Sequence, residues 1–265
     1  MPLILDMPAF GHNLADHVTF SISFRMKGHH GANREFSGWR LLRHVAQYYA
    51  FRSGLMAYTC PELTAMISMD SEARWPDVQI GISPFSMRSS EEMKANPGRA
   101  ALEAQPSYTL NGYYLRSRSR GSVEIQSGDI AQPILIDANW WSDPADQQAL
   151  IRMFRRMRHY AAQPALKPHT VQEVTPGAQF ESDEQIARVL EWLAGPGLHA
   201  IGTCRMGGPD DSVLDSRRRV HGIRGLRVAD CSAMPTLPSG NTNAPAMMLG
   251  YRAAESIIED RQRSS

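Results

Sequence analysis

The clearest pattern of hydrophobic and polar positions lies in residues 18–26, VTFSISFRM. Apolar side chains occupy every second position of this segment: Val18, Phe20, Ile22, Phe24 and Met26. An alternation with a period of two predicts a half-buried strand of an antiparallel sheet. Further strands are expected at 77–83, 107–115, 122–126 and 133–137, the last three separated by turn-rich stretches. Together these segments predict a meander or a mixed sheet.

Two helices are indicated by apolar residues at helical spacing in the second half of the chain. The first covers about residues 144–161, where Ser142-Asp143-Pro144 offers a cap followed by proline in the first turn. Ser182 and Gln185 form a capping-box pattern ahead of the second helix. Gly195-Pro196-Gly197 ends this helix, because glycine and proline interrupt helical backbone.

A third helix is expected near the C-terminus, over about residues 245–260, and it begins with proline at a permitted early position. Residues 226–230, LRVAD, lie between the second and third helices and predict a short apolar strand. The polar segments 27–38 and 87–106 are typical of surface loops.

Composition and charge narrow the class of protein. The 265 residues carry 28 Lys and Arg against 27 Asp and Glu, a formal net charge of +1, which argues against a non-specific nucleic-acid binder or a polybasic membrane-surface protein. No stretch approaches the roughly 20 apolar residues of a membrane span, and MPLILDMPAF lacks the basic start of a signal peptide. The three cysteines are widely spaced, which predicts a reduced, cytoplasmic protein: Cys60, Cys204 and Cys231.

The segment that begins at His199 is dense in glycine, proline and small polar residues, as functional loops often are. It contains HAIGTCRMG at 199–207, DSVLDSRRRVHGIRGLRVADCSAMP at 211–235 and SGNTNAP at 239–245, followed by a helix. This succession resembles the C-terminal signature of the glucose-methanol-choline oxidoreductases. The resemblance implies a flavoenzyme that carries FAD and oxidises an alcohol as its small-molecule substrate.

Three earlier segments are similar to the same family and occur in its order. They are MPAFGHNLADH at 7–17, WPDVQIGISPF at 75–85 and LRSRSRGSVEIQSGDIAQPILIDANWWSDPADQQAL at 115–150. The resemblance therefore covers nearly the whole chain. Within the first segment, it implies that three residues anchor the crossover between the domains of such an enzyme: Asn13, Asp16 and His17.

Oxidation of an alcohol by hydride transfer needs a base for the hydroxyl proton, donors that hold the incipient alkoxide, and an electron sink. Histidine titrates near neutrality, so His199 could serve as the base, although a lone histidine can also be a hydrogen-bonded loop residue. The surrounding GTCRMG favours catalysis. The resemblance places the second catalytic residue of the family, His in some members and Asn in others, at Asn241, whose amide would donate to the substrate oxygen.

The resemblance also assigns the cofactor contacts. Residues 241–245 would run beside the flavin ring, where the N-terminus of the last helix suits developing negative charge. Asp230 would lie by the phosphate and ribityl region of FAD, although it could equally be an ordinary residue at a strand end. The expected cofactor-binding residues are Asp230, Asn243, Ala244 and Pro245.

No metal site is expected. His29 and His30 stand side by side in a polar loop, but without carboxylate or cysteine neighbours they do not make a typical ligand set. The identity of the alcohol is not readable from the sequence. An aromatic cage for the quaternary ammonium of choline is not evident, and Glu62 is the one candidate for its anionic companion.

The fold class that follows combines α+β and α/β parts. A substrate-binding domain over 18–190 would have a largely antiparallel sheet with helices. Residues 1–17 and 191–265 would be the crossover segment and the C-terminal part of a doubly wound FAD-binding domain. The G-x-G-x-x-G turn that grips the ADP end of FAD is not in the sequence. The chain is thus expected to need an N-terminal FAD-binding half. The alternatives are one half of a split enzyme, a start further upstream, or a truncated non-catalytic remnant that does not bind FAD alone.

Overall fold

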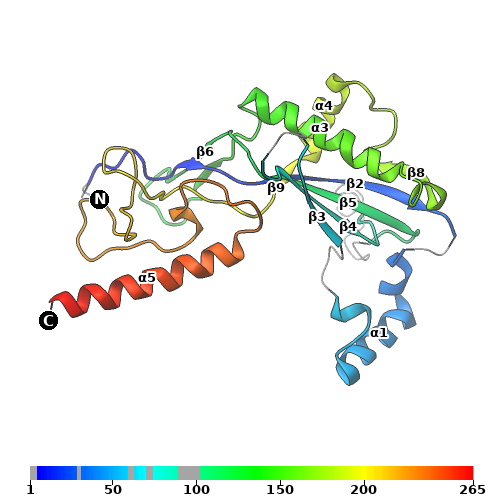
Figure 1. Cartoon of the computed structure of the whole chain (residues 1–265), viewed down its shortest axis with the longest axis horizontal. Helices are drawn as coiled ribbons and strands as arrows, with labels where there is room; N and C mark the ends of the chain where they lie inside the picture. The colour runs from blue at the N-terminus through cyan, green and yellow to red at the C-terminus, as the bar shows by residue number, and fades with distance from the viewer. Residues whose placement is uncertain (1–4, 29–30, 59–62, 70–73, 89–101, 265) are drawn as a thin grey trace. The chain divides into compact units, whose positions relative to one another are not determined.

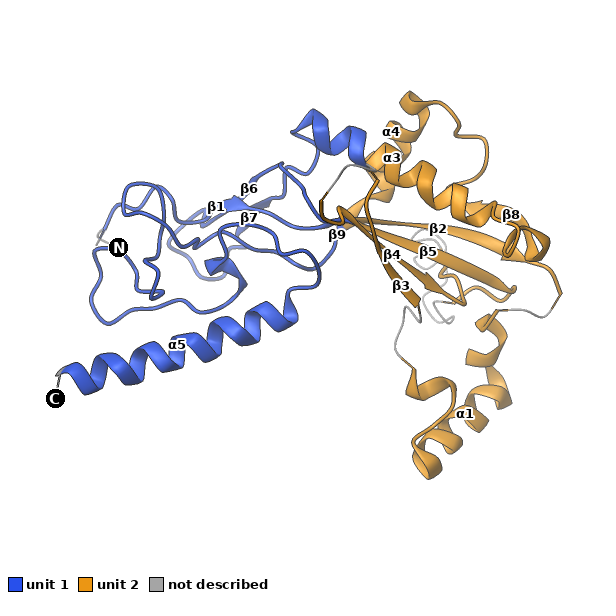
Figure 2. Ribbon diagram, viewed as in Figure 1, with its two compact units in different colours: residues 1–18, 114–149, 196–265 blue, residues 19–113, 150–195 orange. Residues whose placement is uncertain are grey.

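The computed structural model describes residues 5–28, 31–58, 63–69, 74–88 and 102–264 (Figure 1). The chain divides into two compact units, shown in different colours in Figure 2. Unit 1 consists of Met1–Val18, Tyr114–Ala149 and Pro196–Ser265, and unit 2 of Thr19–Tyr113 and Leu150–Gly195. Residues 114–149 thus belong to unit 1, whereas the sequence predicts an unbroken substrate-binding domain over 18–190.

Unit 2 is built on a sheet in the order β3-β4-β5-β2-β8. Its strands are β2 (Val18–Met26), β3 (Leu63–Ile67), β4 (Val78–Ser83), β5 (Ser107–Tyr114) and β8 (Thr170–Thr175). β2 pairs antiparallel with β8, and β3 pairs antiparallel with β4. The strand predicted at 18–26 is confirmed at both ends, and Phe20, Ile22 and Phe24 are buried as the alternation requires. The sequence did not predict β3 or β8.

Helix α3 (Pro144–Ala161) supplies the core of unit 2 with the side chains of Met153, Phe154 and Met157, which are fully buried. Gly112 on β5 makes room for this packing, because a Cβ there would come within 3.0 Å of the sulfurs of Met153 and Met157. The absence of a side chain at one sheet position therefore lets the helix lie close to the sheet.

The sequence predicted both α3 and the next helix, α4 (Asp183–Leu193). The capping box at the start of α4 is confirmed: the Ser182 hydroxyl accepts from the Gln185 N–H, and the Gln185 side chain accepts from the Ser182 N–H. Two backbone donors at the helix start are thereby satisfied.

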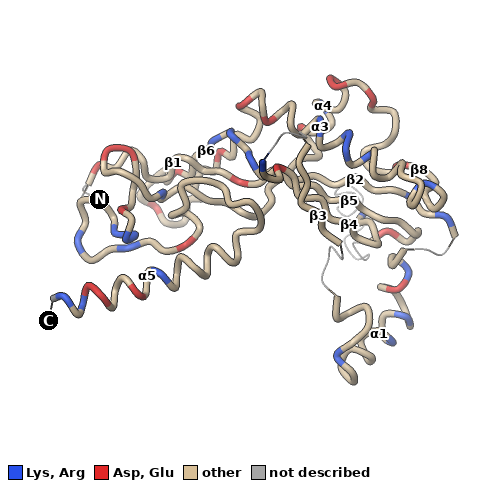
Figure 3. Tube along the Cα trace, viewed as in Figure 1, with Lys and Arg blue, Asp and Glu red and all other residues tan. Residues whose placement is uncertain are grey.

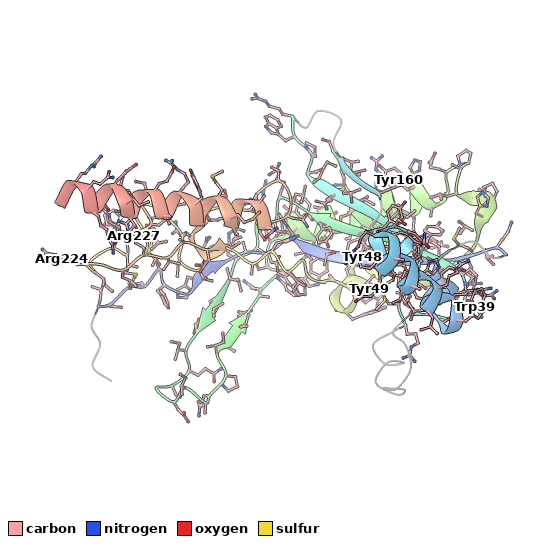
Figure 4. All side chains as sticks on the ribbon, turned by 90° about the horizontal axis from the view of Figure 1, so that it is seen from below. Trp39, Tyr48, Tyr49, Tyr160, Arg224 and Arg227 are labelled. Atoms are coloured by element: carbon pink, nitrogen blue, oxygen red, sulfur yellow. The ribbon has the colours of Figure 1, made fainter. Side chains whose placement is uncertain are left out.

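Helix α1 (Gly38–Phe51) was not predicted, although its apolar residues recur at helical spacing. None of its residues is buried, and Trp39, Tyr49 and Phe51 are each more than 60% exposed. Figure 4 shows Trp39, Tyr48 and Tyr49 along this helix. Burial of apolar side chains, which stabilises the rest of unit 2, therefore does not account for the stability of α1.

Unit 1 has a three-stranded antiparallel sheet in the order β1-β6-β7 and a long helix, α5. The strands are β1 (His12–Leu14), β6 (Gly121–Glu124) and β7 (Leu135–Asp137), and α5 covers Asn243–Ser264. β6, β7 and α5 match predicted elements, and α5 begins two residues before the predicted 245. A buried apolar cluster lies between the loops of this unit: Cys204, Val213, Leu214, Val220 and Ala233.

The strand predicted at 226–230 is wrong. Only Arg227 makes a bridge, to Arg219, and the rest of LRVAD lacks a ladder in the part of the chain that the structure describes. Residues 218–220 pair with this segment, since the Val220 N–H donates to the Leu226 carbonyl and the Val228 N–H to the Arg218 carbonyl, but the pairing stops after this one bridge. The fold class is otherwise confirmed as a mixture of helices and largely antiparallel sheet. Among the described residues, no helix combines the length and apolar character that a bilayer crossing requires.

Candidate active site

His199 lies in unit 1, on the loop that follows α4, and the N-terminal segment of the chain holds this loop in place. The His199 backbone N–H donates to Asp16 Oδ1 at 2.9 Å, and the Gly197 N–H donates to the His17 carbonyl at 2.8 Å. Ala15 and Ile201 exchange two backbone hydrogen bonds, of 3.1 and 2.9 Å. We name the two segments, residues 13–17 and 197–203, the histidine clamp.

Glycine at position 202 allows the two segments of the clamp to approach closely. Gly202 has φ +94°, and a Cβ at this position would lie 2.3 Å from the Asn13 carbonyl oxygen. Next to Gly202, the Thr203 carbonyl accepts a hydrogen bond of 2.9 Å from the Gly11 N–H. Any side chain at 202 would therefore push the two segments apart, because the atom it meets belongs to the backbone.

The imidazoles of His17 and His199 are in direct contact. Their Nδ1 atoms are 3.1 Å apart, and the rings meet edge to face with centroids 5.1 Å apart. His17 is fully buried, and its Nε2 lies 3.0 Å from the carbonyl oxygen of Pro238. His17 thus links His199 to the loop that leads to Asn241, three residues after Pro238.

Burial shifts the titration of all three ionisable groups of the clamp. Loss of solvation, with the nearby His199, lowers the pKa of His17 from 6.5 to about 4. Burial also lowers the pKa of His199, although the Asp16 carboxylate acts in the opposite direction. Burial raises the pKa of Asp16 despite hydrogen bonds from backbone N–H groups, that of His199 among them. Both imidazoles are therefore neutral near pH 7, the state in which an imidazole can accept a proton.

Asn241 is exposed and lies two residues before α5 begins at Asn243. Its loop is attached to the rest of unit 1 on both sides of the residue. Arg116 donates to the Ser239 hydroxyl at 2.9 Å, and the Cys231 thiol lies 3.9 Å from the Thr242 carbonyl. The structure thus brings the loops of His199 and Asn241 together through His17 and Pro238. Catalytic roles for the two residues remain predictions.

The predicted cofactor residues lie at two neighbouring places in unit 1. Asp230 is exposed and caps a short 3-10 helix, η4 (Cys231–Ala233), by accepting from the N–H and hydroxyl of Ser232 at 2.7 and 2.5 Å. η4 lies against α5. Asn243, Ala244 and Pro245 form the first turn of α5. These capping hydrogen bonds give Asp230 a local structural role. Its role in cofactor binding remains a prediction.

The start of α5 fits an FAD. Its first turn contains no acidic residue, and Asn241, Asn243 and Ala244 are exposed. The first N–H groups of a helix have no acceptor within the helix, and the helix dipole places partial positive charge there. An electron-rich ring or an anionic group would be stabilised at this end of α5.

A pocket of unit 1 lies away from these residues. It has a volume of about 1150 Å³ and is lined by residues 219–227, Asp215 and the C-terminal part of α5. Arg224 and Arg227 in this region are marked in Figure 4, and Arg227 pairs with Asp260 on α5. None of the predicted catalytic or cofactor residues lines it.

Figure 3 shows Lys and Arg interspersed with Asp and Glu along both units, consistent with the balanced composition.

His29, His30 and Glu62 are not among the described residues. In the described part of the chain, no cluster of three His, Cys, Asp or Glu could hold a metal ion.

Sequence reasoning missed that Asp16 and His17 hold His199, and assigned both residues to a crossover between domains. An adjacent acid and histidine within an otherwise apolar segment could have signalled a buried polar contact, since such groups rarely lie in a core without partners. The identity of the partner, 182 positions further along the chain, could not be read from that signal.

The part of the chain that contains His199 and Asn241 also matches known proteins. The sequence profile of the family described as GMC oxidoreductase matches residues 117–250, about half of the chain. Oxygen-dependent choline dehydrogenases from Escherichia coli O157:H7 and Cronobacter sakazakii are each 31% identical to it over 257 residues. That alignment covers 97% of this chain and 44% of either relative, so the chain spans less than half the length of the curated relatives it matches.

Solved structures agree on the fold. A formate oxidase from Aspergillus oryzae superposes with a TM-score of 0.86 at 22% identity, over 99% of this chain and 49% of that one. A pyridoxine 4-oxidase from Mesorbium loti superposes with a TM-score of 0.76 at 22% identity, over 96% of this chain and 45% of that one.

Proposed function

Because the chain belongs to the GMC oxidoreductase family, we propose that it supplies the catalytic loops and substrate-binding part of an FAD-dependent oxidoreductase acting on the CH–OH group of alcohols. The observation that carries this proposal is the histidine clamp, which holds a neutral imidazole in one place. Burial lowers the pKa of His199, so the ring is ready to accept a proton at neutral pH. A surface histidine in a mobile loop would have neither property.

The chain's own residues provide the acid–base part of the reaction. His199 would take the hydroxyl proton of the alcohol, and the exposed Asn241 amide would donate a hydrogen bond to the substrate oxygen as negative charge develops there. FAD, when bound, supplies the hydride acceptor that no side chain can provide. The chemistry acts on the carbinol group alone and leaves the rest of the alcohol undefined.

Residues at the start of α5 would hold the cofactor. Asn243, Ala244 and Pro245 form the first turn, of which Asn243 and Ala244 are exposed, and Asp230 caps η4, which packs against the same helix. Residues 1–17 and 191–265 would then be the FAD-domain part of the chain, and 18–190 the substrate-binding part. This division remains part of the proposal.

An N-terminal half that grips the ADP end of FAD is the expected partner. The sequence contains no G-x-G-x-x-G, and the chain matches 44% of the length of the choline dehydrogenases. The same two observations favour a second candidate, a remnant without activity that does not bind FAD. Choline is the first alcohol to test, because these relatives are named for it.

Flavin content separates the two candidates. The protein would be purified from its own host, so that any polypeptide that completes it is retained, and its absorbance recorded before and after addition of FAD. The enzyme candidate predicts flavin bands and oxidation of choline or another primary alcohol. A colourless preparation that stays colourless with added FAD would establish the remnant instead.

A further inference from the structure

The direct contact between two imidazoles in the histidine clamp is not needed to anchor a loop, since backbone hydrogen bonds already do so. We propose that His17 is a positioning residue that fixes the tautomer of His199, with the proton on Nδ1 and the basic lone pair on Nε2. The inference deepens the proposed function, on which the catalytic use of that lone pair rests. The tautomer itself is fixed by contacts within this chain, whether or not the lone pair is used in catalysis.

The proton positions follow from the chemistry of the partners. The Pro238 carbonyl, 3.0 Å from His17 Nε2, can only accept a hydrogen bond, so His17 Nε2 must carry a proton. A neutral imidazole carries one proton, and therefore His17 Nδ1 is an acceptor. Its neighbour at 3.1 Å is His199 Nδ1, which must then be the donor. The neutral His199 ring is left with its lone pair on Nε2.

The surroundings of the pair keep both rings neutral. His17 is fully buried, which disfavours its charged form, and Arg116 and His199 add to that effect. The Asp16 carboxylate favours protonation of the His199 ring, and burial of the Asp16 carboxyl raises its own pKa. Both rings are therefore neutral, and in that state His199 Nδ1 donates the hydrogen bond and His17 Nδ1 accepts it.

The geometry at Gly197 shows how closely the pair is fitted. A Cβ on Gly197 would lie 2.5 Å from the His17 carbonyl oxygen and 3.3 Å from His199 Nδ1. The backbone therefore passes beside the contact between the two rings without room for a side chain. A side chain at position 197 would therefore displace the His17 backbone and disturb the contact between the rings.

Nitrogen NMR of the chain labelled with ¹⁵N-histidine tests the tautomer directly, because long-range proton–nitrogen correlations show which ring nitrogen carries the proton. His199 is identified by the signal lost in His199→Ala. The matched variants are His17→Asn, which can place its amide oxygen near the former Nδ1, and His17→Gln, which can place its amide nitrogen near the former Nε2. We expect Nδ1–H at His199 in the wild type and His17→Asn, and Nε2–H in His17→Gln.

Turnover provides a second readout in the flavin-containing protein. We expect kcat to fall about 10²-fold in His17→Gln, the usual cost of a misplaced catalytic group, with KM little changed and most of kcat retained in His17→Asn. A wild-type His199 that carries its proton on Nε2, or a His17→Gln variant with unchanged tautomer, would overturn the inference. If the tautomers behave as expected but no variant oxidises an alcohol, His17 still fixes the ring, and the proposed function alone fails.

Discussion

The buried His17 should make the chain sensitive to mild acid, and the size of the effect can be worked out from its pKa. A fall from 6.5 in the unfolded chain to about 4 in the folded chain means that the unfolded state binds more protons between these values. The contribution to stability is therefore complete above pH 6.5 and is lost as the pH falls towards 4. The full loss corresponds to about 3 kcal/mol, and about 2 kcal/mol is already lost at pH 5.

The perturbation is His17→Gln, which removes this titration and leaves Asp16 and His199 in the chain. Asp16 acts in the opposite direction, because its raised pKa makes protonation favour the folded state as the pH falls. The difference between wild type and variant isolates His17, since Asp16 is common to both. His12→Gln is the matched control, because the His12 side chain is exposed in the folded chain.

Urea unfolding followed by circular dichroism at pH 7.5 and pH 5 measures the difference. The wild type should lose about 2 kcal/mol more free energy of unfolding between these two pH values than His17→Gln loses. His12→Gln should behave as the wild type does. Equal losses in wild type and His17→Gln would refute the claim that His17 is held neutral by burial.

Three further substitutions test the structure elsewhere. Gly202→Ala should lower the free energy of unfolding by about 1–3 kcal/mol or more, because φ is positive and the new Cβ meets the Asn13 carbonyl; urea unfolding measures this. Ser182→Ala should cost about 1 kcal/mol in the same assay through loss of the α4 cap, and Ser182→Asn should restore most of it. Arg158→Met should cost about 3–5 kcal/mol, since it leaves the nearly buried Glu173 carboxylate without its bidentate partner; a loss below 1 kcal/mol would show that water replaces the guanidinium.

Local patterns in the sequence were sufficient for elements whose signals are contained within them. The alternation in β2, the capping box of α4 and the proline at the start of α3 each place their determinants within a few residues. Helix α1 was missed although its apolar residues have helical spacing, and the structure shows that none of its residues is buried. The segment at 226–230 was misread because apolar character does not show how far a pairing extends, and here it stops after one bridge to Arg219.

Prediction of the candidate site from the sequence was limited in a similar way. Resemblance of motifs selected His199 and Asn241, but the contact that defines the state of His199 comes from His17, 182 residues earlier. Neither periodicity nor motif spacing encodes which nitrogen of one ring meets which nitrogen of another. That information depends on the tertiary fold, which brings residues 13–17 against 197–203.

The rate of alcohol-dependent flavin bleaching shows whether His199 acts as the base. The flavin-containing protein from its own host would be mixed anaerobically with choline, or with whichever alcohol it oxidises, and followed in a stopped-flow spectrophotometer beside His199→Ala. We expect the variant to keep its flavin bands but to bleach about 10²- to 10⁴-fold more slowly, the usual contribution of a general base. Bleaching of His199→Ala at the wild-type rate would contradict the account.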